Sequence, residues 1–279
     1  MAYWEWGNPH SSHVVLCVHG LTRQGRDFDV LAQALCARSG NTLRVVCPDV
    51  AGRGQSEWLK DPQAYQIPFY AADMLALLTQ LKPTTLDWVG TSMGGLIGIV
   101  VCGQPELPLP VPVRRLVIND VGPTIEWQAL RRIGDYLGQP VQFTSLQQAA
   151  DVLWTLASSF GPHTPSQWLA LSRHMVKPVL GTPGALMLHY DPAIALPFRA
   201  VTSESAAQSE AMLWQLYDQI TAKTLLVRGA DSDLLSLATA QAMTQRGPKA
   251  RLVEFAGVGH APTFIADDQV QILASFLLD

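Results

Sequence analysis

Short hydrophobic runs alternate along the chain with longer segments of helical periodicity. Six runs are apolar at almost every position and are followed within two residues by glycine, proline or aspartate: residues 14–18, 43–47, 86–89, 116–118, 224–227 and 251–255. Apolar runs without alternation predict strands that are buried on both faces, as in a parallel sheet covered by helices. Residues 3–6 are expected to add an antiparallel strand at one edge.

The segments between these runs place apolar residues three and four positions apart, which predicts helices. The predicted helices span residues 28–38, 70–81, 94–102, 237–245 and 267–278. Alternating strands and helices predict an α/β fold, in which ligand chemistry belongs at the carboxyl ends of the strands.

One long interval interrupts this alternation. Residues 120–221 contain eight prolines and four tryptophans, and no convincing strand. We interpret the interval as a helical cap, residues 123–215, inserted into a core domain made of residues 1–122 and 216–279. The alternative is that these helices only add packing to the core.

Composition and charge narrow the possible partners. Charged residues make up only 15% of the 279 residues, and the net charge of -4 argues against a nucleic-acid partner. Polybasic clusters are absent, the most apolar run is too short to span a bilayer, and the first residues do not resemble a secretory signal. We therefore expect a cytoplasmic protein without a membrane partner. The four cysteines lack the spacing of a metal site, so no metal is expected.

The strongest chemical signal is Gly90-Thr91-Ser92-Met93-Gly94, a GxSxG pattern between a predicted strand and a predicted helix. This context is typical of a nucleophile elbow, in which a sharp turn exposes the serine hydroxyl. Small residues are needed there because the strand and the helix approach closely. Ser92 is therefore the candidate nucleophile.

A serine needs a neighbouring base, and the base needs a carboxylate to orient it. His260 lies between glycines on the loop after the last predicted strand, which favours it as the base. For the acid we prefer Asp233, which begins the turn into the next helix. Asp231 in the same loop and Asp120 at the tip of the fourth long strand are the alternatives.

The oxyanion that forms during acyl transfer needs two preorganised N–H donors. The residue after the nucleophile, Met93, is expected to supply one. The loop after the first long strand, His19-Gly20-Leu21-Thr22, is expected to supply the other through the N–H of Leu21.

Together these residues resemble the α/β-hydrolase superfamily, in its capped branch of small serine esterases. The resemblance covers roughly residues 12–122 and 221–279, and its motifs are His-Gly-Leu at 19–21, a D-x-x-G-x-G-x-S-like loop at 49–56, the elbow at 90–94 and Gly259-His260. It implies an eight-stranded, mostly parallel sheet with a lid inserted after the sixth strand. The acid doublet at 231 and 233 departs from the single acid that is commoner in the family.

These features favour a serine hydrolase that cleaves a small-molecule carboxylic ester through an acyl-serine, with no cofactor. The alternatives are hydrolysis of a carbon–carbon bond or an enol-lactone by the same residues, and a non-catalytic binding protein of the same fold. Arg23 and Trp58 are candidate substrate-binding residues. The sequence leaves the natural substrate and the oligomeric state open.

Overall fold

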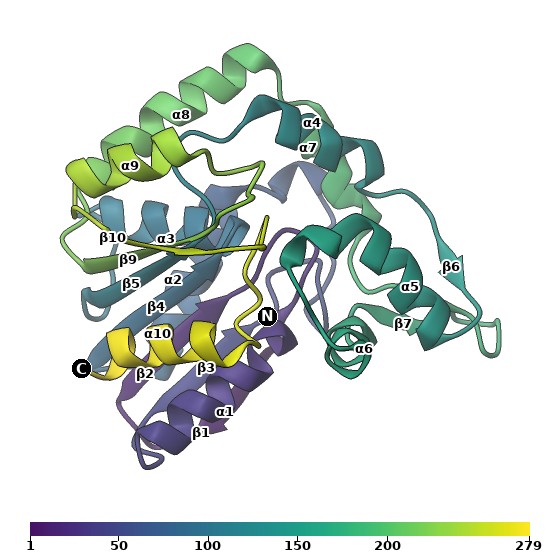
Figure 1. Cartoon of the computed structure of the whole chain (residues 1–279), viewed down its shortest axis with the longest axis horizontal. Helices are drawn as coiled ribbons and strands as arrows, with labels where there is room; N and C mark the ends of the chain where they lie inside the picture. The colour runs from purple at the N-terminus through teal and green to yellow at the C-terminus, as the bar shows by residue number, and fades with distance from the viewer.

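A computed structural model describes all residues of the chain, Met1–Asp279, and its centre is a twisted sheet of seven strands (Figure 1). Six strands are parallel, and the first pairs antiparallel with β3 at one edge. The strand order is β1-β3-β2-β4-β5-β9-β10. Their bounds are β1 Tyr3–Gly7, β2 His13–Val18, β3 Arg44–Pro48, β4 Thr85–Thr91, β5 Val113–Asn119, β9 Lys223–Gly229 and β10 Arg251–Phe255.

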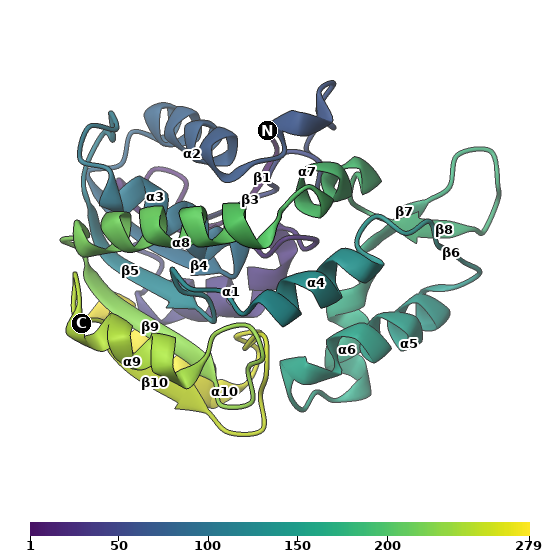
Figure 2. The same cartoon turned by 90° about the horizontal axis from the view of Figure 1, so that it is seen from above.

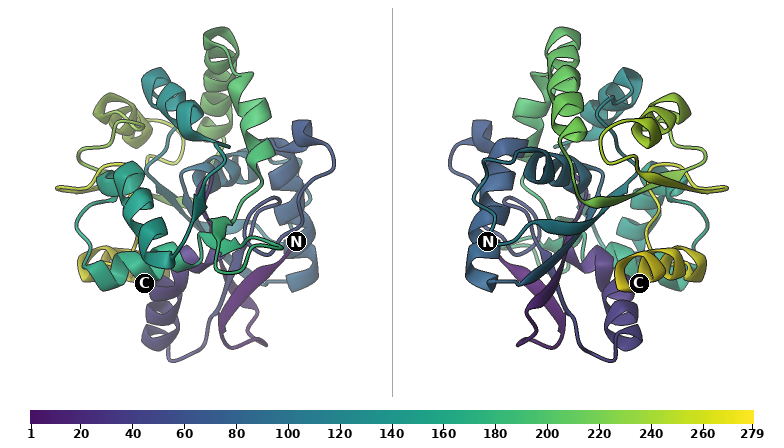
Figure 3. Two further views of the ribbon diagram at one scale, coloured as in Figure 1. Left: turned by 90° about the vertical axis from the view of Figure 1, so that its right-hand side faces the viewer. Right: turned by 90° about the vertical axis from the view of Figure 1, so that its left-hand side faces the viewer.

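Helices cover both faces of this sheet, as Figure 3 shows from two sides. One face packs against α2 Ile67–Leu81, α3 Met93–Gly103, α8 Ser203–Asp218 and α9 Leu237–Gln245. The other face packs against α1 Asp29–Arg38 and α10 Asp267–Leu278. Neighbouring residues of one strand enter opposite cores, because successive side chains of a strand point to opposite faces. Leu16 is in the first core and Val15 and Cys17 are in the second.

Between β5 and β9 the chain leaves the sheet and forms an extension at one side of the molecule (Figure 2). Its helices are α4 Trp127–Tyr136, α5 Leu146–Ala157, α6 Pro165–Arg173 and α7 Ala195–Arg199. It also contains a small antiparallel sheet of β6 Gln142–Phe143, β8 Leu186–Leu188 and β7 Val176–Pro178, in that order.

The prediction of an α/β fold is confirmed, and all seven strands of the sheet lie where the sequence pattern placed them. The expectation of eight strands and a lid after the sixth is wrong, since the sheet has seven and the extension follows the fifth, β5. The expectation that residues 120–221 contain no strand is also wrong, because β6, β7 and β8 lie there. The predicted boundary between residues 215 and 216 falls inside α8, which packs on α3 as part of the main body.

Candidate active site

Ser92 stands in the turn between β4 and α3, at the carboxyl end of the central strands. Its backbone has φ 51° and ψ -115°, a region that residues other than glycine rarely occupy and that often marks a functional site. The turn is tight because Gly90 lies against the carbonyl of Gly94, and Gly94 lies against the carbonyl of Val18. A Cβ at either glycine would collide with backbone, so the sequence pattern is a steric requirement of the turn.

His260 joins Ser92 to a carboxylate. Its Nε2 lies 2.9 Å from Ser92 Oγ, and its Nδ1 lies 2.8 Å from Asp120 Oδ2. A carboxylate can only accept at Nδ1, so the proton of the neutral ring resides there and Nε2 is free to accept the serine proton. The three side chains come from the loops after β4, β5 and β10 and form one hydrogen-bonded chain.

Asp120 is the first residue after β5 and is fully buried. Its Oδ1 accepts the N–H of Gly229 at 2.8 Å, and its Oδ2 accepts the hydroxyl of Ser232 at 2.6 Å as well as the proton on His260. These donors satisfy the buried carboxylate and hold it in one orientation.

The preference for Asp233 as the partner of His260 is therefore wrong. Asp233 is half-exposed and forms a 2.7 Å ion pair with Arg132 of α4. Asp231 is exposed, and its backbone N–H donates to the carbonyl of Val258. Ser232, between the two acids, is the residue of this loop that reaches the site, and it does so by donating to Asp120.

The expected oxyanion donors lie beside the nucleophile. A Cβ built on Gly20 would be 3.7 Å from the Cβ of Ser92, so the loop that carries Leu21 passes close to the serine. The N–H of Leu21 has no backbone or side-chain acceptor. Met93 is the first residue of α3, where helical N–H groups have no partner within the helix. Both N–H groups are thus available to a ligand at Ser92.

His19 fixes the peptide unit that carries the Leu21 N–H. Its Nδ1 donates to the carbonyl of Gly20 at 2.7 Å, and its Nε2 accepts the N–H of Val50 at 2.9 Å. This arrangement requires a neutral ring, and burial lowers the pKa of His19 to about 3. The Gly20 carbonyl and the Leu21 N–H belong to the same trans peptide and point in opposite directions, so His19 fixes the orientation of that N–H.

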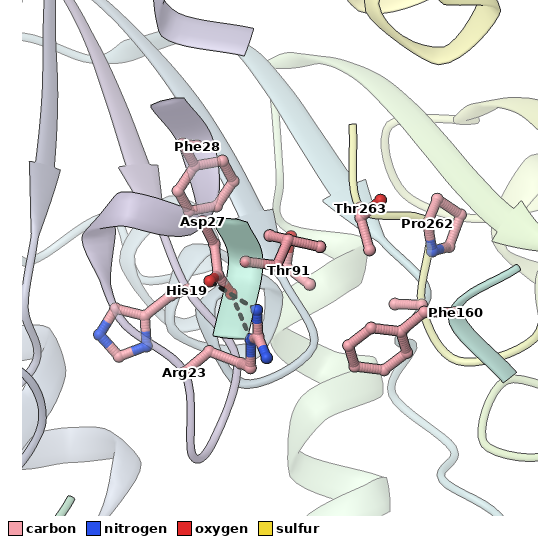
Figure 4. A pocket seen from close by; sticks show the side chains of 10 residues that line it. His19, Arg23, Asp27, Phe28, Thr91, Phe160, Pro262 and Thr263 are labelled. Atoms are coloured by element: carbon pink, nitrogen blue, oxygen red, sulfur yellow. Dashed lines mark hydrogen bonds and ion pairs between the residues drawn. The ribbon is translucent and has the colours of Figure 1, made fainter. Parts of the chain in front are cut away.

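A small pocket opens beside Thr91 and the residues that follow His260 (Figure 4). Arg23 lines it with Nε and Nη2 both donating to Asp27, at 2.5 and 2.7 Å. Burial raises the pKa of Asp27, against the opposing effect of Arg23. Trp58 is not among the pocket residues; its ring is exposed and lies under Lys177 Nζ at 4.3 Å.

The extension touches the loop that carries His260. The carbonyl of Ser159 accepts the N–H of Gly259 at 2.5 Å, and the hydroxyl of Ser159 donates to the carbonyl of His260 at 3.2 Å. His163 Nε2 lies 2.9 Å from Thr263 Oγ1. No local pattern in the sequence predicts these contacts, because they join segments about a hundred residues apart.

Two further findings concern metal sites and membrane-spanning helices. No group of three or more His, Cys, Asp or Glu side chains is arranged to hold a metal ion. None of the helices combines the length and apolar character needed to cross a membrane.

The chain is similar to known proteins over almost its whole length. The sequence profile described as "Alpha/beta hydrolase family" matches residues 15–274. The 3-hydroxybutyrate-oligomer hydrolase of Cupriavidus necator is 50% identical over 277 residues, which are 99% of this chain and 92% of that protein.

Two solved structures are similar over almost the whole chain. A putative hydrolase from Rickettsia typhi shares 30% sequence identity with a TM-score of 0.86, over 99% of this chain and 90% of that one. An alpha/beta hydrolase from Novosphingobium aromaticivorans shares 33% identity with a TM-score of 0.81, over 99% of this chain and 93% of that one.

Proposed function

Because the chain belongs to the alpha/beta hydrolase family, we propose that it is a serine hydrolase that cleaves carboxylic esters through an acyl-serine intermediate. The observation that carries the proposal is the continuous hydrogen-bonded chain from Ser92 through His260 to the buried Asp120. Two free N–H groups next to Ser92 add the donors that acyl transfer needs.

The chemistry follows from this geometry. Ser92 Oγ attacks the ester carbonyl while His260 Nε2 takes its proton, and Asp120 stabilises the imidazolium. The N–H groups of Leu21 and Met93 donate to the oxyanion of the tetrahedral intermediate. His260 then protonates the leaving alcohol. In the second half, water attacks the acyl-serine, His260 accepts the water proton, and the carboxylic acid leaves.

We further propose that the substrates are short oligomers of 3-hydroxybutyrate. The proposal rests on the 50% identity to the Cupriavidus necator enzyme across nearly the whole of both chains. Such an oligomer is a chain of carboxylic esters, so each cut releases one carboxyl and one secondary hydroxyl group. These are the two products that an acyl-serine mechanism delivers in separate steps.

The extension from α4 to α7, which makes up most of the predicted insertion at residues 123–215, acts in this proposal as a cap over the site. The contacts of Ser159 and His163 with the loop around His260 support this role. Arg23 at the neighbouring pocket uses Nε and one N–H of Nη2 to hold Asp27, so the two N–H groups of Nη1 and the second of Nη2 remain to meet the carboxylate end of a substrate.

The test is release of 3-hydroxybutyrate from the linear dimer by the wild type and by Ser92→Ala. Ser209→Ala, which removes an exposed hydroxyl on α8, is the matched control. We expect hydrolysis by the wild type and the control, and loss of about 10³-fold or more in Ser92→Ala. A folded wild type that cleaves neither the dimer nor p-nitrophenyl butyrate would contradict the proposal.

A further inference from the structure

A buried arginine, Arg53, contacts both residues that carry the proposed oxyanion donors, Leu21 and Met93. It is the second residue of the turn Gly52-Arg53-Gly54 after β3, and it is fully buried. Its position in the sequence gives no indication of this burial, because a charged residue between two glycines is typical of an exposed turn.

The guanidinium of Arg53 contacts both segments that carry those donors. Nε donates to the carbonyl of Leu21 at 2.8 Å, and Nη2 approaches Met93 Sδ at 3.5 Å. Nη1 donates to the carbonyl of Ala51 and to the hydroxyl of Tyr70, at 2.8 and 2.9 Å. A single side chain therefore connects the loop after β2 with the start of α3.

Arg53 forms no salt bridge in spite of its burial. Its acceptors are carbonyl oxygens, a hydroxyl and a thioether, and rings of Tyr65 and Tyr70 lie within 5.8 and 4.9 Å of Cζ. Burial lowers the pKa of Arg53 from its ordinary value, yet an arginine stays protonated under all working conditions. The buried carboxylate of Asp191 acts on this charge from beyond Tyr65, whose hydroxyl it accepts, and forms no direct ion pair with Arg53. Burying a charge without a direct ion pair costs free energy, and methionine would fill similar space at a lower cost.

The site next to this charge becomes negative only during the reaction. The tetrahedral intermediate places a negative oxygen at the N–H groups of Leu21 and Met93, and a fixed positive charge in a low-dielectric environment stabilises it. The carbonyl oxygens of the ester substrate and of the acyl-serine carry no such negative charge. The favourable interaction therefore lowers the barrier rather than tightening substrate binding.

We propose that Arg53 is a positioning residue of the oxyanion hole, which fixes the Leu21 loop against α3 and supplies a buried positive charge behind the oxyanion. This inference rests on the proposed serine-hydrolase function. The turn that carries Arg53 is itself held by the extension, because Gly54 N–H donates to the carbonyl of His189 and Asp191 N–H donates to the carbonyl of Gly52.

The experiment compares Arg53→Met, which removes the charge, with Arg53→Lys, which keeps it. Arg115→Met is the matched control, since Arg115 is also buried and without a salt bridge but lies toward the opposite end of β5 from Asp120. The measurements are kcat and KM on p-nitrophenyl butyrate, the inhibition constant of butylboronic acid, and the melting temperature. The boronic acid forms a tetrahedral adduct with serine and so reports on the oxyanion hole directly.

We expect Arg53→Met to lower kcat by about 10- to 100-fold with KM within about twofold, and to weaken boronic acid inhibition by a similar factor. Arg53→Lys should recover part of both losses, and Arg115→Met should match the wild type. A lower melting temperature with unchanged kcat and inhibition constant would show a merely structural role and overturn the inference. So would a rise in KM alone.

A failure of this inference and a failure of the proposed function give different results in this experiment. If the wild type neither hydrolyses the ester nor binds the boronic acid, the proposed function fails and the inference with it. If the wild type is active and Arg53→Met equals it, only the inference fails. Should Arg53→Met not fold, Arg53→Lys decides. A kcat and an inhibition constant equal to those of the wild type would overturn the positioning role of Arg53, and a parallel loss in both would support it.

Discussion

At the scale of single residues, the proposed chemistry depends most on the carboxylate of Asp120. In Asp120→Asn the amide would donate toward His260 Nδ1, which leaves the proton on Nε2 and prevents that nitrogen from accepting the serine proton. We expect kcat to fall by about 10³- to 10⁴-fold. Asp233→Asn removes only an exposed ion pair with Arg132, so its kcat should stay within about twofold of the wild type. A larger loss of kcat in Asp233→Asn than in Asp120→Asn would contradict the geometry.

The sequence was sufficient to single out Ser92 and His260, whose Oγ and Nε2 lie 2.9 Å apart, because each lies in a short motif whose backbone requirements are visible in the residues. It was not sufficient to choose the acid. Three aspartates follow strands, and which one reaches His260 depends on how the loops after β5 and β9 fold against each other. The burial of Asp120 and the inward turn of Ser232 are tertiary features with no local signal.

His19 gives a prediction for stability against pH. Its pKa is lowered from 6.5 to about 3 in the folded protein, so between these values the unfolded chain binds a proton that the folded chain does not. The free energy of unfolding should therefore fall as the pH falls through this window, by up to about 1.4 kcal/mol per pH unit from this residue.

Urea unfolding of the wild type and His19→Gln between pH 7.5 and pH 4.5 measures the contribution. Carboxylates contribute in both proteins, so only the difference in slope belongs to His19. The wild-type slope should exceed that of the variant, and equal slopes would show that His19 is not held neutral.

At the scale of elements, the turn between β4 and α3 depends on close backbone packing. In Gly94→Ala the new Cβ would meet the carbonyl of Val18, so α3 would have to move away from the sheet. We expect a loss of about 3 kcal/mol in the free energy of unfolding, measured by urea denaturation. Gly134→Ala in α4 is the control, since its Cβ would lie 3.7 Å from Phe198 in ordinary contact. It should stabilise the protein by about 0.5–1 kcal/mol. Similar stabilities for the two variants would contradict the steric account.

The strands of the structure differ in how well the pattern of apolar residues predicts them. The strands of the main sheet are buried on both faces, and their continuous apolar runs identify them in the sequence. The strands β6, β7 and β8 have only two or three residues each and are mostly partly exposed. Even β8, which is apolar throughout, is too short for its pattern to identify a strand. They form because β8 lies between β6 and β7, which is a tertiary arrangement.

At the scale of the whole molecule, α5 and α6 have a small core of their own. Ala150, Trp168 and Leu171 form a cluster separate from the two large cores of the sheet. Elements with few buried apolar contacts open locally at lower free energy than the central strands. We expect the backbone amides of α5 and α6 to exchange with deuterium faster than those of β4 and β5. Reaction of Ser92 with a phosphonate should slow the exchange of α5 and α6 if they close over the site. Equal protection of α5, α6 and the central strands would show one cooperative unit.

The central claim is that the acyl group is carried by Ser92. The most direct measurement is mass spectrometry of the protein quenched with acid during turnover of p-nitrophenyl butyrate, followed by peptide mapping. The account predicts one added butyryl group on the wild-type peptide that contains Ser92. In Asp120→Asn this adduct should form at a much lower rate, and in Ser92→Ala it should not form. A butyryl group on another residue, or turnover that persists in Ser92→Ala, would contradict the account.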